Sequence, residues 1–199
     1  VFDHLGIQSI GIDDYEADDV IATLAHESHG PTRIVTGDRD LFQLVDDDRD
    51  IKIVYLAKGI SKHDLVDHKW IAERYEIPGE RYALFAMIRG DASDGLPGIK
   101  GIGEKGAAAI AREFRSMSEV IAAAESSDER LNKKHREKIL ADLEYARVAE
   151  PLVRCATDIR LPKVDFTLSR ERTLDSKLKE IKERYGLGTS IDRLLASLS

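Results

Sequence analysis

The stretch PTRIVTGDRDLFQLV, residues 31–45, joins an apolar, β-branched run to a pair of carboxylates. Its first part predicts a buried strand over 32–37, which ends at Gly37. Asp38 and Asp40 follow directly, at the carboxyl end of that strand. Ligands of open parallel sheets bind at this edge, so the pair is a candidate functional site. Aspartate beside glycine also forms Asx turns in ordinary loops, and a HAD-like phosphatase would place such a pair after its first strand.

The segments around this strand alternate between strand and helix patterns. We expect further strands over 7–12 and 51–57 and a helix over 17–28. A strand, a helix and a strand within about 30 residues are typical of the βαβ unit of a parallel sheet. Residues 1–60 are therefore predicted to form an α/β core, a parallel sheet with flanking helices.

The rest of the chain, residues 61–199, is predicted to be helical, and we expect no strand from residue 64 onward. Its helical patterns are separated by glycine- and proline-containing breaks. The expected helices cover residues 63–75, 80–90, 104–114, 129–156 and 174–184, with a short helix after 190. Trp70, Tyr75 and Phe85 stand at helical spacings and are expected in the core and not as base-stacking platforms.

A second group of carboxylates lies in YEADDVIATLA, residues 15–25. Glu16, Asp18 and Asp19 precede an apolar stretch with helical spacing. Acidic residues in the first turn of a helix are stabilised by the macrodipole, by about 0.3–1 kcal/mol each, so this group alone does not establish a site. Glu16 and Asp18 would share one side of an extended segment, because they are two residues apart.

The third group lies in MIRGDASDGLPGIKGIGEKGAAAI, residues 87–110. Asp91 and Asp94 follow Gly90 on a predicted turn from which both side chains can reach one point. All seven acidic residues of the three groups are oxygen ligands, and such a density of like charge favours hard cations, Mg²⁺ or Mn²⁺. Two such ions form the clamp used for in-line hydrolysis of a phosphodiester.

The second half of this stretch predicts a phosphate-binding turn. Gly101 and Gly103 allow the backbone to approach a phosphate at the amino end of a helix that begins near residue 104. A helix, a glycine turn and a helix, over about 84–115, are typical of the helix-hairpin-helix, which grips the nucleic-acid backbone. GIGEKG also matches the dinucleotide fingerprint GxGxxG, but no strand precedes it. The candidate DNA-binding residues are Gly101, Gly103, Lys105 and Lys100.

The net charge of −7 would ordinarily argue against a nucleic-acid partner, but the charge is unevenly distributed, as it also would be with a merely solvated acidic face. Residues 1–50 carry a net charge of −10, and the remainder carries +3. An acidic pole beside a basic body suits a cation site next to a polyanion. The single cysteine excludes an internal disulfide, and no run is apolar enough for a membrane span or signal peptide, so we expect a soluble cytoplasmic protein without a membrane partner.

The three motifs, in this order and spacing, resemble the 5′→3′ exonuclease domain of bacterial DNA polymerase I and its stand-alone relatives in the flap endonuclease family. The resemblance implies a resolvase-like (PIN-like) nuclease core, a helix-hairpin-helix, and a monomer that hydrolyses DNA at 5′ ends, flaps or nicks. It also implies a potassium ion at the glycine turn. The ligands it implies are Glu16 and Asp18 for the first metal, Asp38 and Asp40 with Asp94 for the second, and Asp19 and Asp91 directly or through water.

Two departures from the family pattern stand out. Gly95 occupies a position where asparagine is common. The family's first strand, with its metal-binding aspartate, and the arch rich in Lys and Arg do not occur in this sequence, whose start resembles the segment after the arch. We therefore expect part of a longer nuclease. The alternative to an active nuclease is a catalytically silent helix-hairpin-helix DNA-binding fragment.

Overall fold

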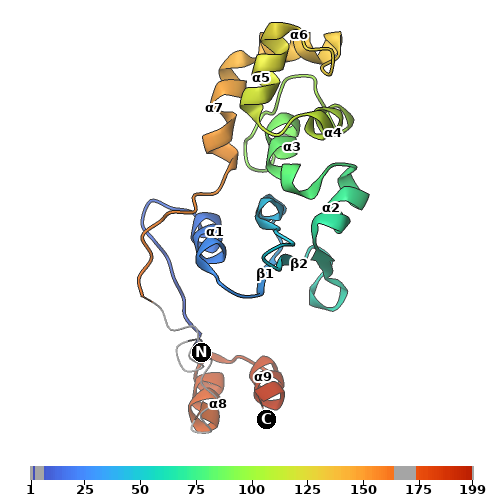
Figure 1. Cartoon of the computed structure of the whole chain (residues 1–199). Helices are drawn as coiled ribbons and strands as arrows, with labels where there is room; N and C mark the ends of the chain where they lie inside the picture. Colours follow the sequence, from blue (N-terminus) through green and yellow to red (C-terminus); the bar gives the residue numbers. More distant parts are fainter. Residues whose placement is uncertain (1, 3–6, 164–173, 199) are drawn as a thin grey trace. The chain divides into compact units, whose positions relative to one another are not determined.

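The computed structural model describes residues 2, 7–163 and 174–198. The chain divides into two compact units, one formed by residues 17–159 and the other by residues 1–16 with 160–199 (Figure 1). Among the described residues, no helix is both long and apolar enough to cross a membrane.

The larger unit contains a three-stranded sheet with the order β1-β2-β3. β1 (Thr32–Thr36) and β2 (Ile51–Tyr55) are parallel, with Ile34 opposite Ile53, and both of these side chains are buried. α1 (Ala17–Glu27) precedes β1 in the chain. These elements confirm the helix and the two strands predicted for residues 17–57. The β-branched side chains bury one face of each strand, and the backbones of the two strands are hydrogen-bonded to each other.

The sheet ends in a strand that the sequence did not predict. β3 (Asp64–Val66) is antiparallel to β2, with Val66 opposite Ile53. α2 (His68–Tyr75) starts only after Asp67, whose side chain accepts a hydrogen bond from the Trp70 amide at 2.8 Å. The expectation of a helix from residue 63 and of no strand after 64 was therefore wrong. Three residues are too few to show the alternating pattern of a strand. Their extended conformation depends on hydrogen bonds to the edge of β2.

Residues 7–12 form no strand, so that prediction was also wrong. Most of their side chains are exposed, including Ile7 at 37%. A strand persists only where a neighbour satisfies its backbone groups, and within the described residues no ladder pairs with this segment. The alternating apolar pattern of residues 7–12 is therefore not sufficient to form a strand.

The remainder of the larger unit is built from helices joined by short connections. The helix predicted over 129–156 is divided in two, because the backbone leaves the helical conformation at Asp142. A helix that was not predicted begins after Ser116, whose hydroxyl accepts a hydrogen bond from the Glu119 amide at 3.2 Å, the first half of a capping box. The helices are α3 (Tyr82–Arg89), α4 (Glu104–Glu113), α5 (Met117–Ser126), α6 (Lys133–Ala141) and α7 (Leu143–Val153).

Three short 3-10 segments and the two helices of the smaller unit complete the described elements. The 3-10 segments are η2 (Asp40–Leu44), η3 (Ile60–Lys62) and η4 (Gly79–Arg81). α8 (Leu174–Tyr185) and α9 (Ser190–Leu198) confirm the predicted last helices, and they bury Leu178 and Ile191 between them.

An aromatic cluster joins the sheet to the helices of the larger unit. The ring of Phe42, in η2, lies 4.9 Å from Tyr55 of β2 and 5.3 Å from Tyr82 of α3, measured between centroids. Tyr75 and Phe85, which are 5.2 Å apart, are buried, as predicted. η2 is therefore fixed to α3 through Phe42, two residues after Asp40.

Replacement of Phe42 by alanine should lower the free energy of unfolding by about 3–5 kcal/mol, because its ring is fully buried and contacts several elements. Urea denaturation measures the loss. Val35→Ala is the control, since Val35 is 61% exposed and should change stability by less than about 0.5 kcal/mol. A loss below about 1 kcal/mol for Phe42→Ala would contradict this role.

Candidate functional site

The turn after β1 directs Asp38 and Asp40 differently. The Asp38 amide donates to the Thr36 hydroxyl at 2.9 Å, and the Asp38 carboxylate accepts from the Asp40 amide at 2.9 Å. Asp38 is exposed and is engaged in this Asx turn, whereas Asp40 is partly buried at the start of η2. Asp38 therefore forms an Asx turn, and Asp40 begins η2 directly after it.

The loop after α3 brings in the third acidic group. Asp91 and Leu96 exchange backbone hydrogen bonds of 3.0 and 2.9 Å, which close a tight turn. Asp91 is fixed from both sides: Ser93 donates its amide and hydroxyl to Oδ1, while Arg39 and Arg89 each donate to Oδ2 at 3.1 Å. The Ser93 hydrogen bonds lower the pKa of Asp91, and the two arginines lower it further, against the effect of burial.

Asp40, Asp91 and Asp94 form an acidic cluster in which one carboxylate oxygen of each lies within 4.8 Å of the others. Burial raises the pKa of Asp40 to about 6, and the charges of Asp38, Asp94 and Asp91 add to the effect. Asp91 has two arginine partners, whereas the negative charge of Asp40 is disfavoured by the nearby carboxylates. Such a set of hard oxygen donors is suited to a divalent cation.

α1 is connected to this region by a segment at the end of α7. The Ala156 amide donates to the Asp19 carboxylate at 2.8 Å, and the Thr23 hydroxyl donates to the Ala156 carbonyl at 3.3 Å. Burial, and then the charges of Asp18, Asp19 and Asp40, raise the pKa of the Cys155 thiol to about 12. The thiol is therefore within electrostatic reach of carboxylates from both α1 and η2.

Gln43 ties the same segment to η2. Its Nε2 donates to the carbonyls of Asp40 and Val153, both at 2.9 Å, and its Oε1 accepts from the Cys155 amide at 3.2 Å. Residues 153–156, which we call the strap, thus hold α1 and η2 together. The strap lies more than 100 residues from both elements in the chain.

The structure brings three of the seven predicted acidic residues into one cluster and places the other four around it or elsewhere. Asp40, Asp91 and Asp94 form the acidic cluster, Asp38 adjoins it, and Asp18 and Asp19 lie in α1 beside the strap. Glu16 belongs to the smaller unit. Three residues that shape the cluster were not among the predicted site residues: Arg39, Arg89 and Gln43. Arg39, between Asp38 and Asp40, was a usable signal because a cation among predicted ligands is expected to pair with a carboxylate, but its partner Asp91 lies 52 residues away and could not be read from the local sequence.

The glycine turn lies at the other end of the same loop. Gly90 and Gly98 approach each other so closely that a Cβ on Gly90 would lie 2.5 Å from the Gly98 nitrogen, and both have positive φ. Beyond them, Gly101 and Gly103 are exposed, and Gly103 caps α4 without a side-chain hydrogen bond. The first amides of α4 are thus presented beside the exposed Lys105.

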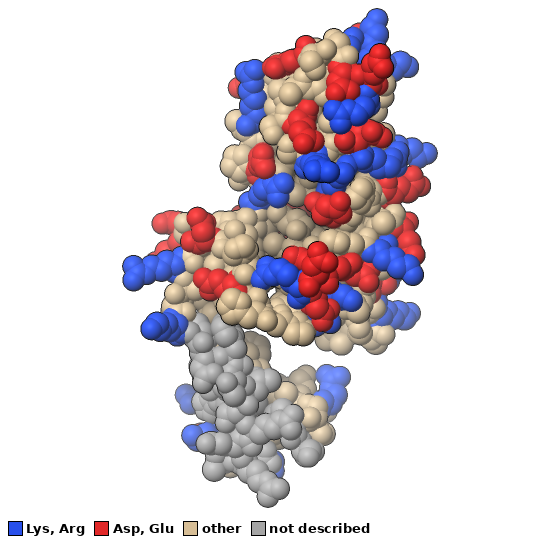
Figure 2. All heavy atoms as spheres, in the orientation of Figure 1, with Lys and Arg blue, Asp and Glu red and all other residues tan. Residues whose placement is uncertain are grey.

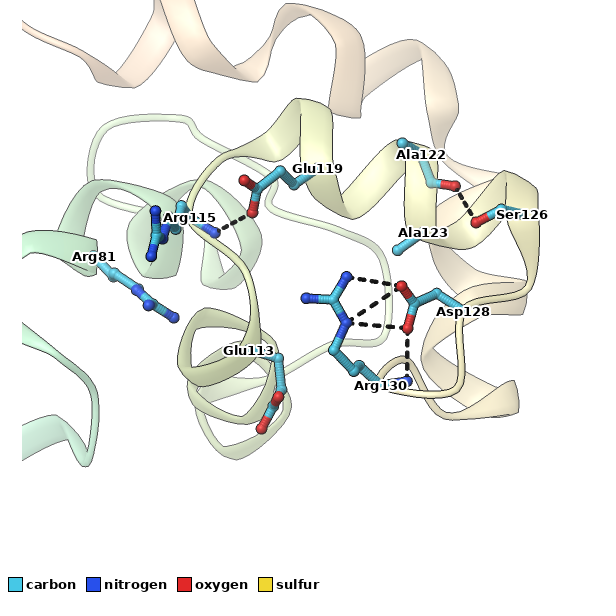
Figure 3. Close-up of a pocket in the computed structure, with 9 residues that line it drawn as sticks. All are labelled: Arg81, Glu113, Arg115, Glu119, Ala122, Ala123, Ser126, Asp128 and Arg130. Carbon is cyan, nitrogen blue, oxygen red and sulfur yellow. Dashed lines mark hydrogen bonds and ion pairs between the residues drawn. The ribbon is translucent and has the colours of Figure 1, made fainter.

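Charged side chains also surround a separate hollow between η4, α4 and α5. A pocket of about 570 Å³ is lined by Arg81, Arg115 and Arg130 together with acidic residues (Figure 3). Arg130 pairs with Asp128 at 2.8 Å, and the Arg115 amide donates to the Glu119 carboxylate at 2.8 Å. Figure 2 shows basic and acidic side chains interspersed over the surface of α4, α5 and α6. None of the predicted site residues lines this pocket, and we assign it no function.

Two family models together match residues 1–187. The model described as "5′-3′ exonuclease, N-terminal resolvase-like domain" matches residues 1–76, and "5′-3′ exonuclease, C-terminal SAM fold" matches residues 77–187. The phage T5 5′-exonuclease, solved as a point mutant, has a similar fold, with a TM-score of 0.57 and 22% identity over 72% of this chain and 57% of the T5 chain.

Curated relatives match the whole chain. A 5′-3′ exonuclease of Streptomyces coelicolor is 43% identical over 100% of this chain and 66% of its own length, and one of Mycobacterium tuberculosis is 39% identical over 100% and 65%. The thermostable DNA polymerase I of Thermus thermophilus is 36% identical over 96% of this chain and 21% of its own length. The chain spans about two thirds of the first two relatives. It belongs to the 5′-3′ exonuclease family.

Proposed function

We propose that this chain is the metal-binding and DNA-binding part of a 5′-3′ nuclease that hydrolyses phosphodiester bonds at 5′ ends, flaps and nicks of DNA. The observation that carries the proposal is the acidic cluster of Asp40, Asp91 and Asp94, at the carboxyl end of β1 and on the loop that leads to the glycine turn. The relatives are named 5′-3′ exonucleases, and one T5 neighbour is a complex with DNA and metal ions. The protein would act as a cytoplasmic monomer.

We propose two divalent ions, Mg²⁺ or Mn²⁺, one of them at the acidic cluster. Oxygen-only ligands favour such hard cations. The pKa of Asp40 is raised first by burial and then by the charges of Asp38, Asp94 and Asp91, and a bound cation would offset both effects. A T5 neighbour was solved with zinc bound. When bound, the ions would supply an acidified water and stabilise the leaving oxygen. The proposed ligands are Glu16 and Asp18 for one ion and Asp38, Asp40 and Asp94 for the other, with Asp19 and Asp91 acting directly or through water.

The chain's own residues hold these ligands in place. Arg39 and Arg89 keep Asp91 ionised and oriented, so that the cluster persists without a cation. Gln43 holds the backbone of Asp40, and the strap holds Asp19. Gly101, Gly103, Lys105 and Lys100 would bind the phosphate backbone at the amino end of α4. Potassium is not part of the proposal, because the Gly101 carbonyl already accepts a hydrogen bond from Lys138.

Replacement of Asp40 by asparagine should reduce Mg²⁺-dependent cleavage of a labelled 5′-flap DNA by about 100-fold or more, since it removes an anionic ligand from the cluster. DNA affinity, measured without divalent metal, should change less than about threefold. Asp48→Asn, an exposed aspartate outside the cluster, is the control and should cleave normally. Full cleavage by Asp40→Asn would exclude the proposed mechanism, and binding without cleavage by the unchanged chain would favour the silent DNA-binding alternative.

The same variant should be more stable than the unchanged protein in EDTA at neutral pH. The pKa of Asp40 is raised from 3.8 to about 6 in the folded state, so its ionisation costs stability as the pH rises through that interval. The gain from Asp40→Asn should therefore be full near pH 7 and shrink toward pH 4. Urea midpoints at several pH values measure it. A gain that is absent at neutral pH, or that grows as the pH falls, would show that Asp40 is not electrostatically strained.

Lys105→Ala should weaken binding to duplex DNA of every sequence and make the slope of log affinity against log salt less negative by about 1, as expected for one phosphate contact. Fluorescence anisotropy at several salt concentrations measures the slope. Lys69→Ala is the control, because Lys69 is equally exposed on α2 and pairs with Glu73. A loss that depends on base sequence would contradict backbone binding.

A further inference from the structure

α6 covers one side of the glycine turn. Lys138 of α6 donates a hydrogen bond from Nζ to the Gly101 carbonyl. A Cβ on Gly101 would lie 3.3 Å from Lys138 Cε and 3.4 Å from Nζ, so the lysine stem lies directly across the glycine. At the end of α6, Asp142 accepts a hydrogen bond from the Lys100 amide at 2.9 Å. The turn is thus held by two contacts to α6 and its C-terminal cap: Lys138 binds the Gly101 carbonyl, and Asp142 binds the Lys100 amide.

A potassium ion, which the resemblance to the family implies at this turn, does not fit these contacts. Such an ion would be held by backbone carbonyl oxygens. The Gly101 carbonyl is already occupied by an ammonium group, and the lysine stem fills the space beside it. A second positive charge at the same oxygen would be repelled.

The charge of Lys138 is not cancelled by an acidic side chain. Lys133, on the same helix, pairs with Glu137 at 3.9 Å. For Lys138, no carboxylate of the described residues lies within ion-pair distance. The neighbouring His135 has a pKa lowered by burial and then by the charge of Lys138, which shows that this charge acts on its surroundings. An ammonium group has three donors, and the Gly101 carbonyl uses one of them.

We propose that Lys138 is the built-in cation of the glycine turn: its ammonium group neutralises the Gly101 carbonyl and offers its remaining N–H groups to a DNA phosphate beside Lys105. The proposal rests on the DNA-binding function proposed above. Its consequence is that DNA binding by this protein does not depend on the kind of monovalent cation in solution. Tethering the cation also removes the cost of capturing an ion from solution.

The test measures binding of the whole chain to a nicked duplex by fluorescence anisotropy, in EDTA, with potassium, sodium or tetramethylammonium chloride at equal concentration. The unchanged protein should bind within twofold in all three salts. Lys138→Met should bind about tenfold more weakly in sodium and tetramethylammonium, as expected for the loss of a charge-assisted hydrogen bond, and regain affinity in potassium. Lys134→Met, an exposed lysine of the same helix, is the control and should show no dependence on the cation.

Several results would overturn the proposal. Tighter binding of the unchanged protein in potassium, by fivefold or more, would mean that the turn takes a free ion, and this comparison needs no variant that could misfold. Unaltered binding by folded Lys138→Met in every salt would exclude the lysine from the interface. If the unchanged protein binds no DNA in any salt, the proposed function itself fails, which is a distinct outcome.

Discussion

Electrostatic repulsion among the carboxylates around Asp40 is the constraint on which the site depends. Burial and three neighbouring carboxylates disfavour its ionisation, so folding must supply the free energy that keeps them together. The chain does this locally, because the residues that follow Asp40, Leu41 and Phe42, are fully buried and anchor η2 in the core. Asp91 is held differently, by two arginines and Ser93. The cluster is thus partly neutralised within the protein and partly left for a cation.

The same loop connects this cluster to the glycine turn. It leaves α3 at Gly90, carries Asp91 and Asp94, folds back where Gly98 meets Gly90, and enters α4 after Gly103. Neither Gly90 nor Gly98 has room for a side chain, so the backbone packs closely where the loop folds back. This packing would help to position a phosphate bound at the turn relative to the acidic cluster.

Local patterns in the sequence were sufficient for elements whose own residues decide their structure. β1, β2, α1 and α4 follow from short-range apolar periodicity, and the three acidic groups follow from their motifs. β3 and the failed strand over 7–12 depend instead on whether a partner strand is present, which local pattern does not contain. Gln43 and the strap could not be predicted for the same reason: their hydrogen bonds join residues 110 or more positions apart.

The acidic cluster and the glycine turn differ in how a positive charge would be supplied to them. A cation that activates water must keep open positions and exchange with solvent, so the acidic cluster leaves Asp40 without a basic partner of its own. At the glycine turn the proposed role of a cation is only to neutralise a carbonyl and attract a phosphate, and the tethered ammonium group of Lys138 would do both. Lys138 loses some side-chain entropy there, but no ion has to be immobilised from solution. If both proposals hold, the fold leaves a cation exchangeable where hydrolysis requires it and supplies a tethered one where only binding is needed.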